Sequence, residues 1–416
     1  MATSTTASGV IDGPAAWMRL IAALALGSIG GAGMWSVVVA LPAVQDEFGV
    51  ARGAASLPYA LTTIGFGLGG VLMGRLSDRF GILLPVVIGA ISLSLGYILA
   101  GFSQNLWQYA IVHGVLIGLG TSTVFAPMMA DISHWFRRRR GIAVSICACG
   151  NYVAGTIWPP VLQHFIATQG WRPTLIGFGI FCALTMLPLA LAFRRKLPKA
   201  DREAGLAMPA GSSASPGGWQ PRDLGISSGT LQTLLIVAGV GCCVAMSMPQ
   251  VHLVAYCGDL GYGPARGAEM LSVMLGLGII SRLASGLIAD RLGGIATLLL
   301  GSLLQGVALL LYLPFDGLVS LYVVSGLFGL FQGGIVPMYA IIVREYFSPR
   351  EAGARVGIVI MATLFGMAFG GWISGAIFDL TGSYKAAFAN GVLWNLLNVA
   401  IVSWLLIRSR RPLQPA

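Results

Sequence analysis

One arginine stands inside a long apolar segment of this 416-residue chain and has the clearest potential for chemistry. Arg282 lies eight positions before Asp290, and a guanidinium among apolar side chains is costly unless it binds an anion. The apolar segments hold few carboxylates to pair with it, Asp131 being the main one. We therefore expect Arg282 to bind the carboxylate of a ligand. The alternative is an arginine that pairs with a neighbouring helix or extends to a polar boundary.

One fixed charge predicts a ligand with a single carboxylate. The segment 354–378 contains no further Lys or Arg beyond Arg355 at its start, where a carrier of dicarboxylates would need a second deep cation. Two histidines in apolar segments, His252 and His113, are candidates for carrying a proton, because imidazole changes charge near neutral pH. Each of them could instead be a hydrogen-bonded packing residue.

Polar and aromatic side chains in the middle of apolar segments could line a cavity for a small acid. Asn151 and Gln332 are the strongest of these, because a buried amide is costly without a partner or water. Helix packing is the alternative for each one singly. The full set of candidate substrate-binding residues is Arg282, Asn151, Tyr152, Tyr59, Gln332, Phe331, Tyr339 and Phe365.

The composition indicates the class of protein that must position these candidate binding residues. The chain is 56% hydrophobic and only 10% charged, whereas a soluble domain has about 25% charged residues. Lipid-facing surfaces need no charge, so the composition indicates an integral membrane protein and argues against an enzyme. The six cysteines show no metal-ligand spacing, and we expect no metal and no cofactor other than a coupling proton.

Twelve apolar stretches of about 20 residues are long enough to cross a bilayer as helices. They lie near 17–42, 55–76, 82–102, 107–134, 141–165, 172–194, 230–256, 266–289, 295–314, 318–344, 354–378 and 386–407. Of the 25 Lys and Arg residues, 20 fall in the termini and even-numbered loops and four in the odd-numbered loops. The positive-inside rule then predicts that both termini are cytoplasmic, and the one-sided charge argues against nucleic acid as a partner.

The chain also repeats itself. GRLSDRFG at 74–81 returns as GLIADRLG at 286–293, ARGA at 51–54 returns at 265–268, and PM at 127–128 returns at 337–338. The nearly constant offset predicts two pseudo-symmetric six-helix halves of an all-α membrane protein. We expect a cytoplasmic N-terminal tail at 1–16, halves at 17–194 and 230–407, a Ser/Gly/Pro-rich cytoplasmic linker at 195–229, and a C-terminal tail at 408–416.

The octet GRLSDRFG and its weaker copy resemble the loop signature of the major facilitator superfamily, although Ile82 and Leu83 replace the usual basic residues. The resemblance implies twelve transmembrane helices and transport by alternating access. It also implies that the loop aspartates Asp78 and Asp290 hold the cytoplasmic ends together, with Arg140 and Arg355 as partners.

A second resemblance, to the monocarboxylate transporter family and its bacterial relatives, rests on longer passages. It is carried by HWF at 134–136, RGIA at 140–143, GNYVAG at 150–155, PP at 159–160, GWR at 170–172 and VHLVAY at 251–256. It implies that Arg282 binds the substrate carboxylate and that lactate-like or pyruvate-like cargo moves with a proton. The sequence departs from the family at Gly278, where animal members have an acidic residue, and at GGAGMW, 30–35, which is uncharged.

The sequence therefore predicts a secondary active transporter in the cell (inner) membrane that moves a small monocarboxylate, such as lactate or pyruvate, together with a proton. We expect it to work as a monomer in the lipid bilayer. The alternative is a carboxylate:carboxylate antiporter of the oxalate and formate type. A channel-like facilitator or a non-transporting sensor of the same fold is a more distant alternative.

Overall fold

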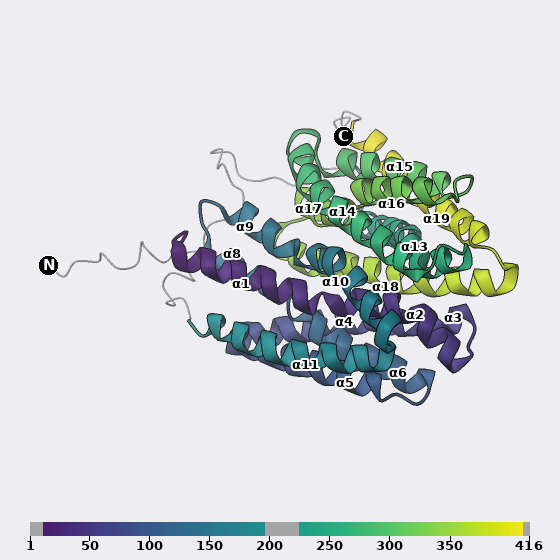
Figure 1. Ribbon diagram of the computed structural model, residues 1–416. Coiled ribbons are helices and arrows are strands. Elements are labelled where there is room, and N and C mark those ends of the chain that lie inside the picture. Colours follow the sequence, from purple (N-terminus) through teal and green to yellow (C-terminus); the bar gives the residue numbers. More distant parts are fainter. Residues whose placement is uncertain (1–10, 196–223, 411–416) are drawn as a thin grey trace.

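Long helices that run roughly side by side build the molecule (Figure 1). The computed structural model describes residues 11–195 and 224–410. Within these ranges, twelve helical segments are long and apolar enough to cross a membrane, as the sequence predicts. The protein is an integral membrane protein. Most of the expected linker and tails, at 1–10, 196–223 and 411–416, lies outside the described residues.

Several of the twelve spans consist of more than one helical segment. The N-terminal six spans are α1 (Pro14–Gly30) with α2 (Ala32–Phe48), α3 (Arg52–Ala55) with α4 (Leu57–Phe80), α5 (Leu83–Gly101), α6 (Leu106–Val112) with the π-helix η1 (His113–Ile117), α7 (Gly118–Ser122) and α8 (Ala126–Trp135), α9 (Arg140–Ala148) with α10 (Gly150–Gln169), and α11 (Trp171–Ala190) with η2 (Leu191–Phe193). The C-terminal six are α13 (Ser228–Asp259), α14 (Pro264–Leu292), α15 (Gly294–Leu311), α16 (Leu318–Gln332) with α17 (Ile335–Tyr346), α18 (Pro349–Thr381) and α19 (Tyr384–Ser409).

The expected ends of the spans are the least accurate part of the sequence prediction. The first span is expected at 17–42 but runs over Pro14–Phe48. Its helix α2 continues through the polar residues after Pro42 and ends at Gly49, which adopts a left-handed conformation with φ of 60°. Polarity marks the edge of the hydrocarbon layer, whereas a helix ends where the backbone turns.

Very close helix contacts at glycine residues occur at corresponding places in the two halves. Gly65 of α4 packs on the backbone of Gly114, and Gly118 lies against the Gly65 backbone. In the other half, Gly278 of α14 packs on Gly333. Small residues let helix backbones approach in lipid, where van der Waals contact rather than the hydrophobic effect holds helices together. These contacts agree with the two-fold repeat in the sequence.

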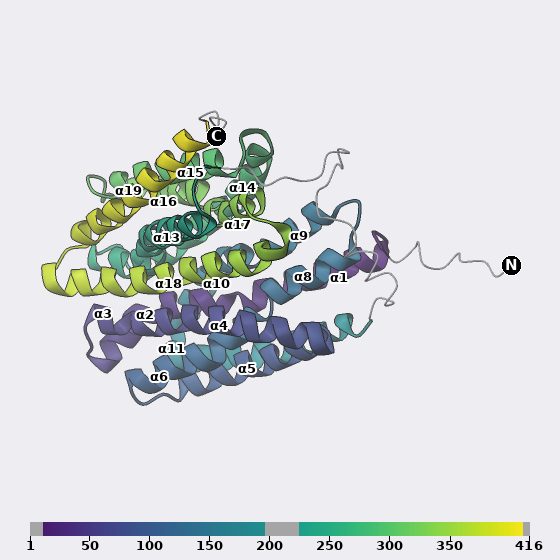
Figure 2. The ribbon, with the colours of Figure 1, turned by 180° about the vertical axis from the view of Figure 1, so that it is seen from behind.

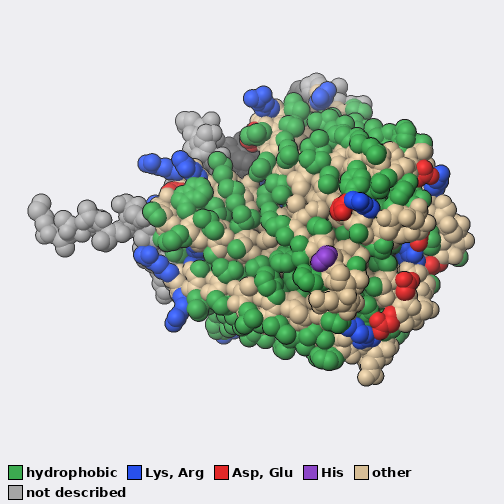
Figure 3. All heavy atoms as spheres, viewed as in Figure 1, with side chains coloured by type: hydrophobic (Ala, Val, Ile, Leu, Met, Phe, Trp, Pro, Cys, Tyr) green, Lys and Arg blue, Asp and Glu red, His purple; other side chains and the backbone are tan. Residues whose placement is uncertain are grey.

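The two halves meet chiefly where α10 packs on α14 and where α3 and α4 pack on α18, and α2 also packs on α13. Figure 2 shows α18 lying between α13 and the N-terminal-half helices α2 and α4. We call the end of the bundle where α1 begins and α19 ends the terminal end, and the opposite end the distal end. Hydrophobic side chains cover the visible flank, and most visible Asp and Glu gather toward the distal end, on the right (Figure 3).

Candidate functional site

Arg282 lies where α14 of one half meets α10 of the other. Its Nη1 donates a hydrogen bond to the carbonyl oxygen of Ala148 at 3.1 Å, and its Nε donates to that of Gly333 at 3.3 Å. The guanidinium carbon lies 4.4 Å from the centre of the Tyr152 ring. In the part of the chain that the structure describes, no carboxylate forms an ion pair with Arg282. About three of its five N–H donors therefore remain for a ligand.

Interruptions in the spans supply the carbonyl oxygens that hold Arg282. Ala148 is the last residue of α9, before the break at Cys149, and Gly333 lies in the break between α16 and α17. A carbonyl at a helix end lacks its usual intrahelical partner and is free to accept another hydrogen bond. Broken helices that line a cavity are a common way to build a binding site in transporters. Arg282 is thus oriented by backbone groups and not neutralised.

Asp131, the expected carboxylate partner, is engaged elsewhere. Both of its oxygens accept hydrogen bonds from Arg19 of α1, at 2.7 and 3.0 Å. Arg19 is only 4% exposed, and its guanidinium packs over the rings of Trp135 and Phe193. Since this pair lies within the N-terminal half, it braces that half, and Asp131 is not available to Arg282.

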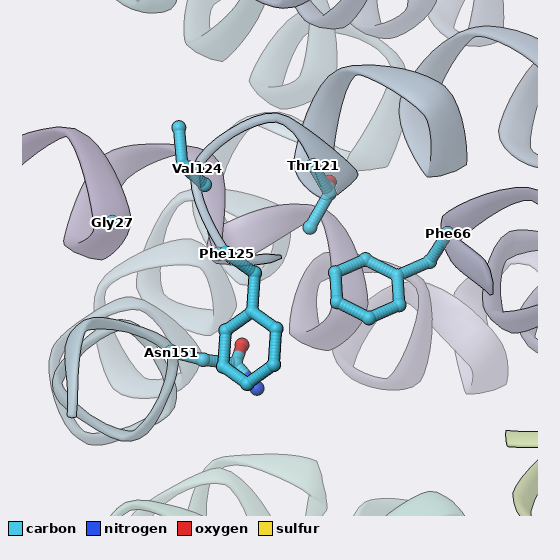
Figure 4. Close-up of a pocket in the computed structure, with 7 residues that line it drawn as sticks. Gly27, Phe66, Thr121, Val124, Phe125 and Asn151 are labelled. Carbon is cyan, nitrogen blue, oxygen red and sulfur yellow. The ribbon is translucent and has the colours of Figure 1, made fainter. Parts of the chain in front are cut away.

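A small pocket lies within the N-terminal half, against Asn151 of α10 (Figure 4). Gly27, Gly31, Phe66, Thr121, Val124, Phe125 and Asn151 line it. Figure 4 shows the Phe66 and Phe125 rings and the Asn151 amide around the same space. The Asn151 side-chain oxygen is buried and has no hydrogen-bond partner in the structure. In this conformation the pocket has room for about one water molecule.

Tyr152 of α10 lies four residues after Ala148 on the same side of this span, which places its ring against Arg282. Asn151, the residue before Tyr152, lines the pocket instead, and its role in binding a substrate at Arg282 stays a prediction. Gly31, in the break between α1 and α2, permits close packing against α10, because an added Cβ would lie 2.9 Å from the Cβ of Ala154 and 3.1 Å from the Cα of Asn151.

The other candidate wall residues are not all placed at this site. Tyr59 and Gln332 are fully buried, and the Tyr59 hydroxyl and the Gln332 amide have no hydrogen-bond partner in the structure. Tyr339 instead donates a hydrogen bond to Asn398 at 3.2 Å inside the C-terminal half. Phe365 is 58% exposed and stacks on Phe369 of its own helix. Phe331 is half-buried and packs against the hydrophobic core.

The two candidate proton carriers lie in different surroundings. His113 is fully buried at the start of the π-helix η1, with its Nδ1 3.5 Å from the Thr62 hydroxyl and no partner for its Nε2. His252 is also fully buried, but both ring nitrogens are hydrogen-bonded, to the Tyr384 hydroxyl at 3.2 Å and to the Gly371 carbonyl at 2.7 Å. His252 is therefore connected to a network that His113 does not share.

That network joins the two halves at the distal end. Arg52 of the N-terminal half binds both carboxylate oxygens of Asp259 at 3.2 Å and donates to the Tyr384 hydroxyl at 2.7 Å. The carboxylate of Asp379 accepts hydrogen bonds from the backbone N–H groups that begin α3. We call the five side chains Arg52, Asp259, Asp379, Tyr384 and His252 the distal clasp.

Toward the terminal end, the same helices separate. Gly67 of α4 lies against α18, where an added Cβ would be 2.9 Å from the Met361 sulfur. Gly74 lies seven residues further along the same face of α4, and Gly357 lies four residues before Met361 on α18. A Cβ at Gly74 or Gly357 would meet no atom within 4 Å. Within residues 11–195 and 224–410, the halves are therefore joined at the distal end, whereas α4 and α18 do not touch at Gly74 and Gly357 toward the terminal end.

The four residues expected to hold the terminal end together do not meet in this conformation. Arg355 pairs with Glu351 on its own helix at 2.8 Å, and Arg140 donates to Ser133 in its own half. Asp78 and Asp290 are exposed, and neither forms an ion pair within residues 11–195 and 224–410. These four residues could meet only in the opposite conformation, so their role as a cytoplasmic gate stays a prediction.

Sequence reasoning missed several functional features. It treated Arg52 and Arg19 as loop or end charges that report only topology, although both are buried and paired. The repeated ARGA motif was the available signal for Arg52. Nothing in the local sequence around Phe66 and Phe125 distinguishes pocket aromatics from packing aromatics.

Twelve membrane-spanning helices in two corresponding sets, with a polar site at interrupted spans between them, define a membrane transport protein. The family model of the Major Facilitator Superfamily matches residues 23–320 and 279–416, and the chain belongs to this superfamily. It is a transporter of that superfamily.

Two relatives cover nearly all of the chain. Monocarboxylate transporter 13 of Rattus norvegicus is 28% identical over 396 residues, which are 91% of this chain and 86% of the relative. Monocarboxylate transporter 11 of Mus musculus is 27% identical and covers 92% of this chain and 85% of its own length. The chain is similar to the monocarboxylate transporters.

Solved structures share the fold. The nucleoside transporter NupG matches with a TM-score of 0.72 at 12% identity, over 94% of this chain and 99% of that one. A bacterial homolog to the human lysosomal transporter Spinster matches with a TM-score of 0.66 at 15% identity, over 95% and 96%. At this identity the likeness shows the fold alone.

Proposed function

We propose that this transporter carries a small organic monocarboxylate across the cell membrane together with a proton, by alternating access. The observation that carries the proposal is Arg282, a half-buried cation between the two halves that is held by carbonyl oxygens and paired with no carboxylate among the described residues. A carboxylate that binds the free guanidinium donors would lie beside Tyr152 and Asn151. The names of the relatives support this class of substrate.

The charge distribution supports the orientation. With Lys and Arg concentrated in the termini and even-numbered loops, the terminal end faces the cytoplasm and the distal end faces outward. The conformation described above is then inward-facing. His252 is the preferred proton site, because it is linked to a contact between the halves, whereas His113 is enclosed within one half. A monomer is sufficient, because the whole site lies within one chain.

The test is uptake of labelled lactate into proteoliposomes that contain the purified protein, with and without an inward proton gradient. We expect saturable uptake and, with the gradient, accumulation above the external concentration. Exchange of one preloaded carboxylate for another, without any net gradient-driven uptake, would replace the symporter by the antiporter. Non-saturable flux would indicate a channel.

We expect the side-chain oxygen of Asn151 to accept a hydrogen bond from the 2-hydroxyl group of lactate. Asn151→Leu should raise the KM for lactate about two- to tenfold, since one hydrogen bond in a buried site contributes about 0.5–1.5 kcal/mol. The KM for propionate, which lacks the 2-hydroxyl group, should change less. Concentration-dependent initial rates for both acids measure this, and equal shifts would mean that Asn151 shapes the pocket without bonding the hydroxyl.

A further inference from the structure

The distal clasp places a buried arginine between the two halves. Arg52 is 8% exposed although it lies only three residues after the turn at Gly49. Its guanidinium binds Asp259 through two hydrogen bonds and Tyr384 through a third, and it packs 4.9 Å from the Phe378 ring centre. Bidentate hydrogen bonds between an arginine and a carboxylate are strong and require a specific geometry. All three partners belong to the C-terminal half.

Asp379 adds a second link that uses backbone groups. Its Oδ1 and Oδ2 accept hydrogen bonds from the N–H groups of Arg52 at 2.8 Å and Gly53 at 2.7 Å. A Cβ at Gly375 would lie 2.9 Å from the Cα of Gly53, so glycine is needed for this approach. The halves cannot separate here without breaking ionic hydrogen bonds that shield the distal end.

The donors and acceptors around His252 determine where the protons lie in the series of hydrogen bonds from Arg52 through Tyr384 to His252. The Gly371 carbonyl only accepts, so His252 Nε2 donates to it. In the neutral ring, Nδ1 must then accept from the Tyr384 hydroxyl, whose oxygen accepts from Arg52. A protonated ring would carry a hydrogen on Nδ1, and the Tyr384 hydroxyl would lose the acceptor for its own proton. A neutral His252 therefore satisfies every donor and acceptor of this chain of hydrogen bonds, whereas a protonated one leaves the Tyr384 proton without its acceptor.

Comparing Arg52 with the equivalent residue of the internal repeat shows which of its contacts are specific to Arg52. Its counterpart in the second ARGA motif is Arg266, which pairs with Glu269 three residues away on the same helix at 2.9 Å. Arg266 is exposed and makes no described contact with the other half. Equivalent sequence positions thus serve different purposes, and only Arg52 connects the halves.

We propose that the distal clasp is the gate that closes the distal end of the carrier, and that protonation of His252 opens it. This inference rests on alternating access as proposed above, but not on the identity of the transported acid. Protonation places a second positive charge on the Arg52 network and breaks the hydrogen-bond chain through Tyr384. The ionisable groups around His252 are Arg52 of α3, Tyr59 of α4, Tyr256 and Asp259 of α13, Asp379 of α18 and Tyr384 of α19.

Distances between spin labels at the distal end test the gate without any substrate. Labels at Gln104→Cys and Phe315→Cys report on exposed positions in distal loops of opposite halves, and the six native cysteines are buried. We expect a short distance to dominate in the otherwise unchanged protein in lipid nanodiscs. Arg52→Gln should increase the ratio of long to short distances about tenfold or more, because it removes the buried cation that joins Asp259 and Tyr384 to the N-terminal half.

Arg266→Gln is the matched control, since it removes the same charge at the same end and should leave the distances unchanged. Asp379→Asn provides an independent break of the gate and should shift the distances in the same direction as Arg52→Gln. If Arg52→Gln and Asp379→Asn, both folded and monodisperse, keep the short distance, the clasp is not the gate. A long distance in the unsubstituted protein would contradict it equally.

The proton dependence is read from the same labels. Lowering the pH from about 8 to about 4 should protonate His252 and increase the ratio of long to short distances about tenfold. His252→Gln retains one donor and one acceptor but cannot take up a proton, so most of this response should disappear. Any pH response that remains in His252→Gln is then due to titration of Asp259 and Asp379. An unchanged pH response in His252→Gln would exclude His252, whether or not lactate proves to be the substrate.

Discussion

Arg282→Gln is expected to abolish gradient-driven accumulation of lactate. The substitution removes the only cation that the structure places at the contact of α10 and α14 in the described residues. Loss of one member of a buried, hydrogen-bonded ion pair costs about 2–5 kcal/mol, and about 2 kcal/mol already corresponds to a roughly thirtyfold loss. Initial rates of uptake into proteoliposomes measure the effect.

Arg282→Lys separates charge from geometry. Lysine keeps the positive charge but has no planar fork, and it cannot bridge the Ala148 and Gly333 carbonyls while also binding a carboxylate at two points. We expect partial activity with a raised KM. Arg266→Gln, which removes an exposed arginine of the same half, is the control and should transport normally.

Folding is checked by gel filtration and thermal stability, since the amide introduced by Arg282→Gln can still donate to one carbonyl oxygen. Normal lactate uptake by folded Arg282→Gln would exclude Arg282 as the carboxylate anchor. Equal loss of stability and activity would instead make it a structural residue that ties together the helix breaks at Cys149 and Gly333–Gly334.

The twelve spans and the isolation of Arg282 were readable from the sequence because both depend on local composition. A run of apolar residues crosses lipid wherever it stands, and a cation inside such a run is conspicuous. Helix interruptions were not predicted, since the breaks at Gly31 and Cys149 carry no polar signal. The pocket lies at these breaks, so its aromatic walls, Phe66 and Phe125, were missed with them.

Long-range pairing explains the remaining differences. Arg52 and Asp379 are 327 positions apart, and neither reveals the other by its neighbours. A charge next to a loop is usually solvated, which is why Arg52 was assigned to topology alone. In this conformation the C-terminal half covers the loop. Arg52 is therefore buried, and its charge forms a contact between the halves. The same reasoning applies to Arg19.

Asp131→Asn is expected to produce the largest loss of stability among single substitutions at charged residues. Arg19 and Asp131 are 4% and 16% exposed, and the side chain of Arg19 also donates to the carbonyls of Ala192 and Arg195. Removing one partner of a buried pair costs about 3–5 kcal/mol, because the remaining charge stays buried without compensation. Thermal unfolding in detergent should show a markedly lower midpoint.

The reciprocal variant Arg19→Met leaves Asp131 unpaired and should destabilise the protein similarly. The double variant Arg19→Met with Asp131→Leu replaces the pair by apolar side chains of comparable size and should recover most of the lost stability, as buried ion pairs often tolerate apolar replacement. Failure of the double variant to recover would show that the carbonyl contacts of Arg19, rather than its charge balance with Asp131, hold the ends of α1, α8 and α11 together.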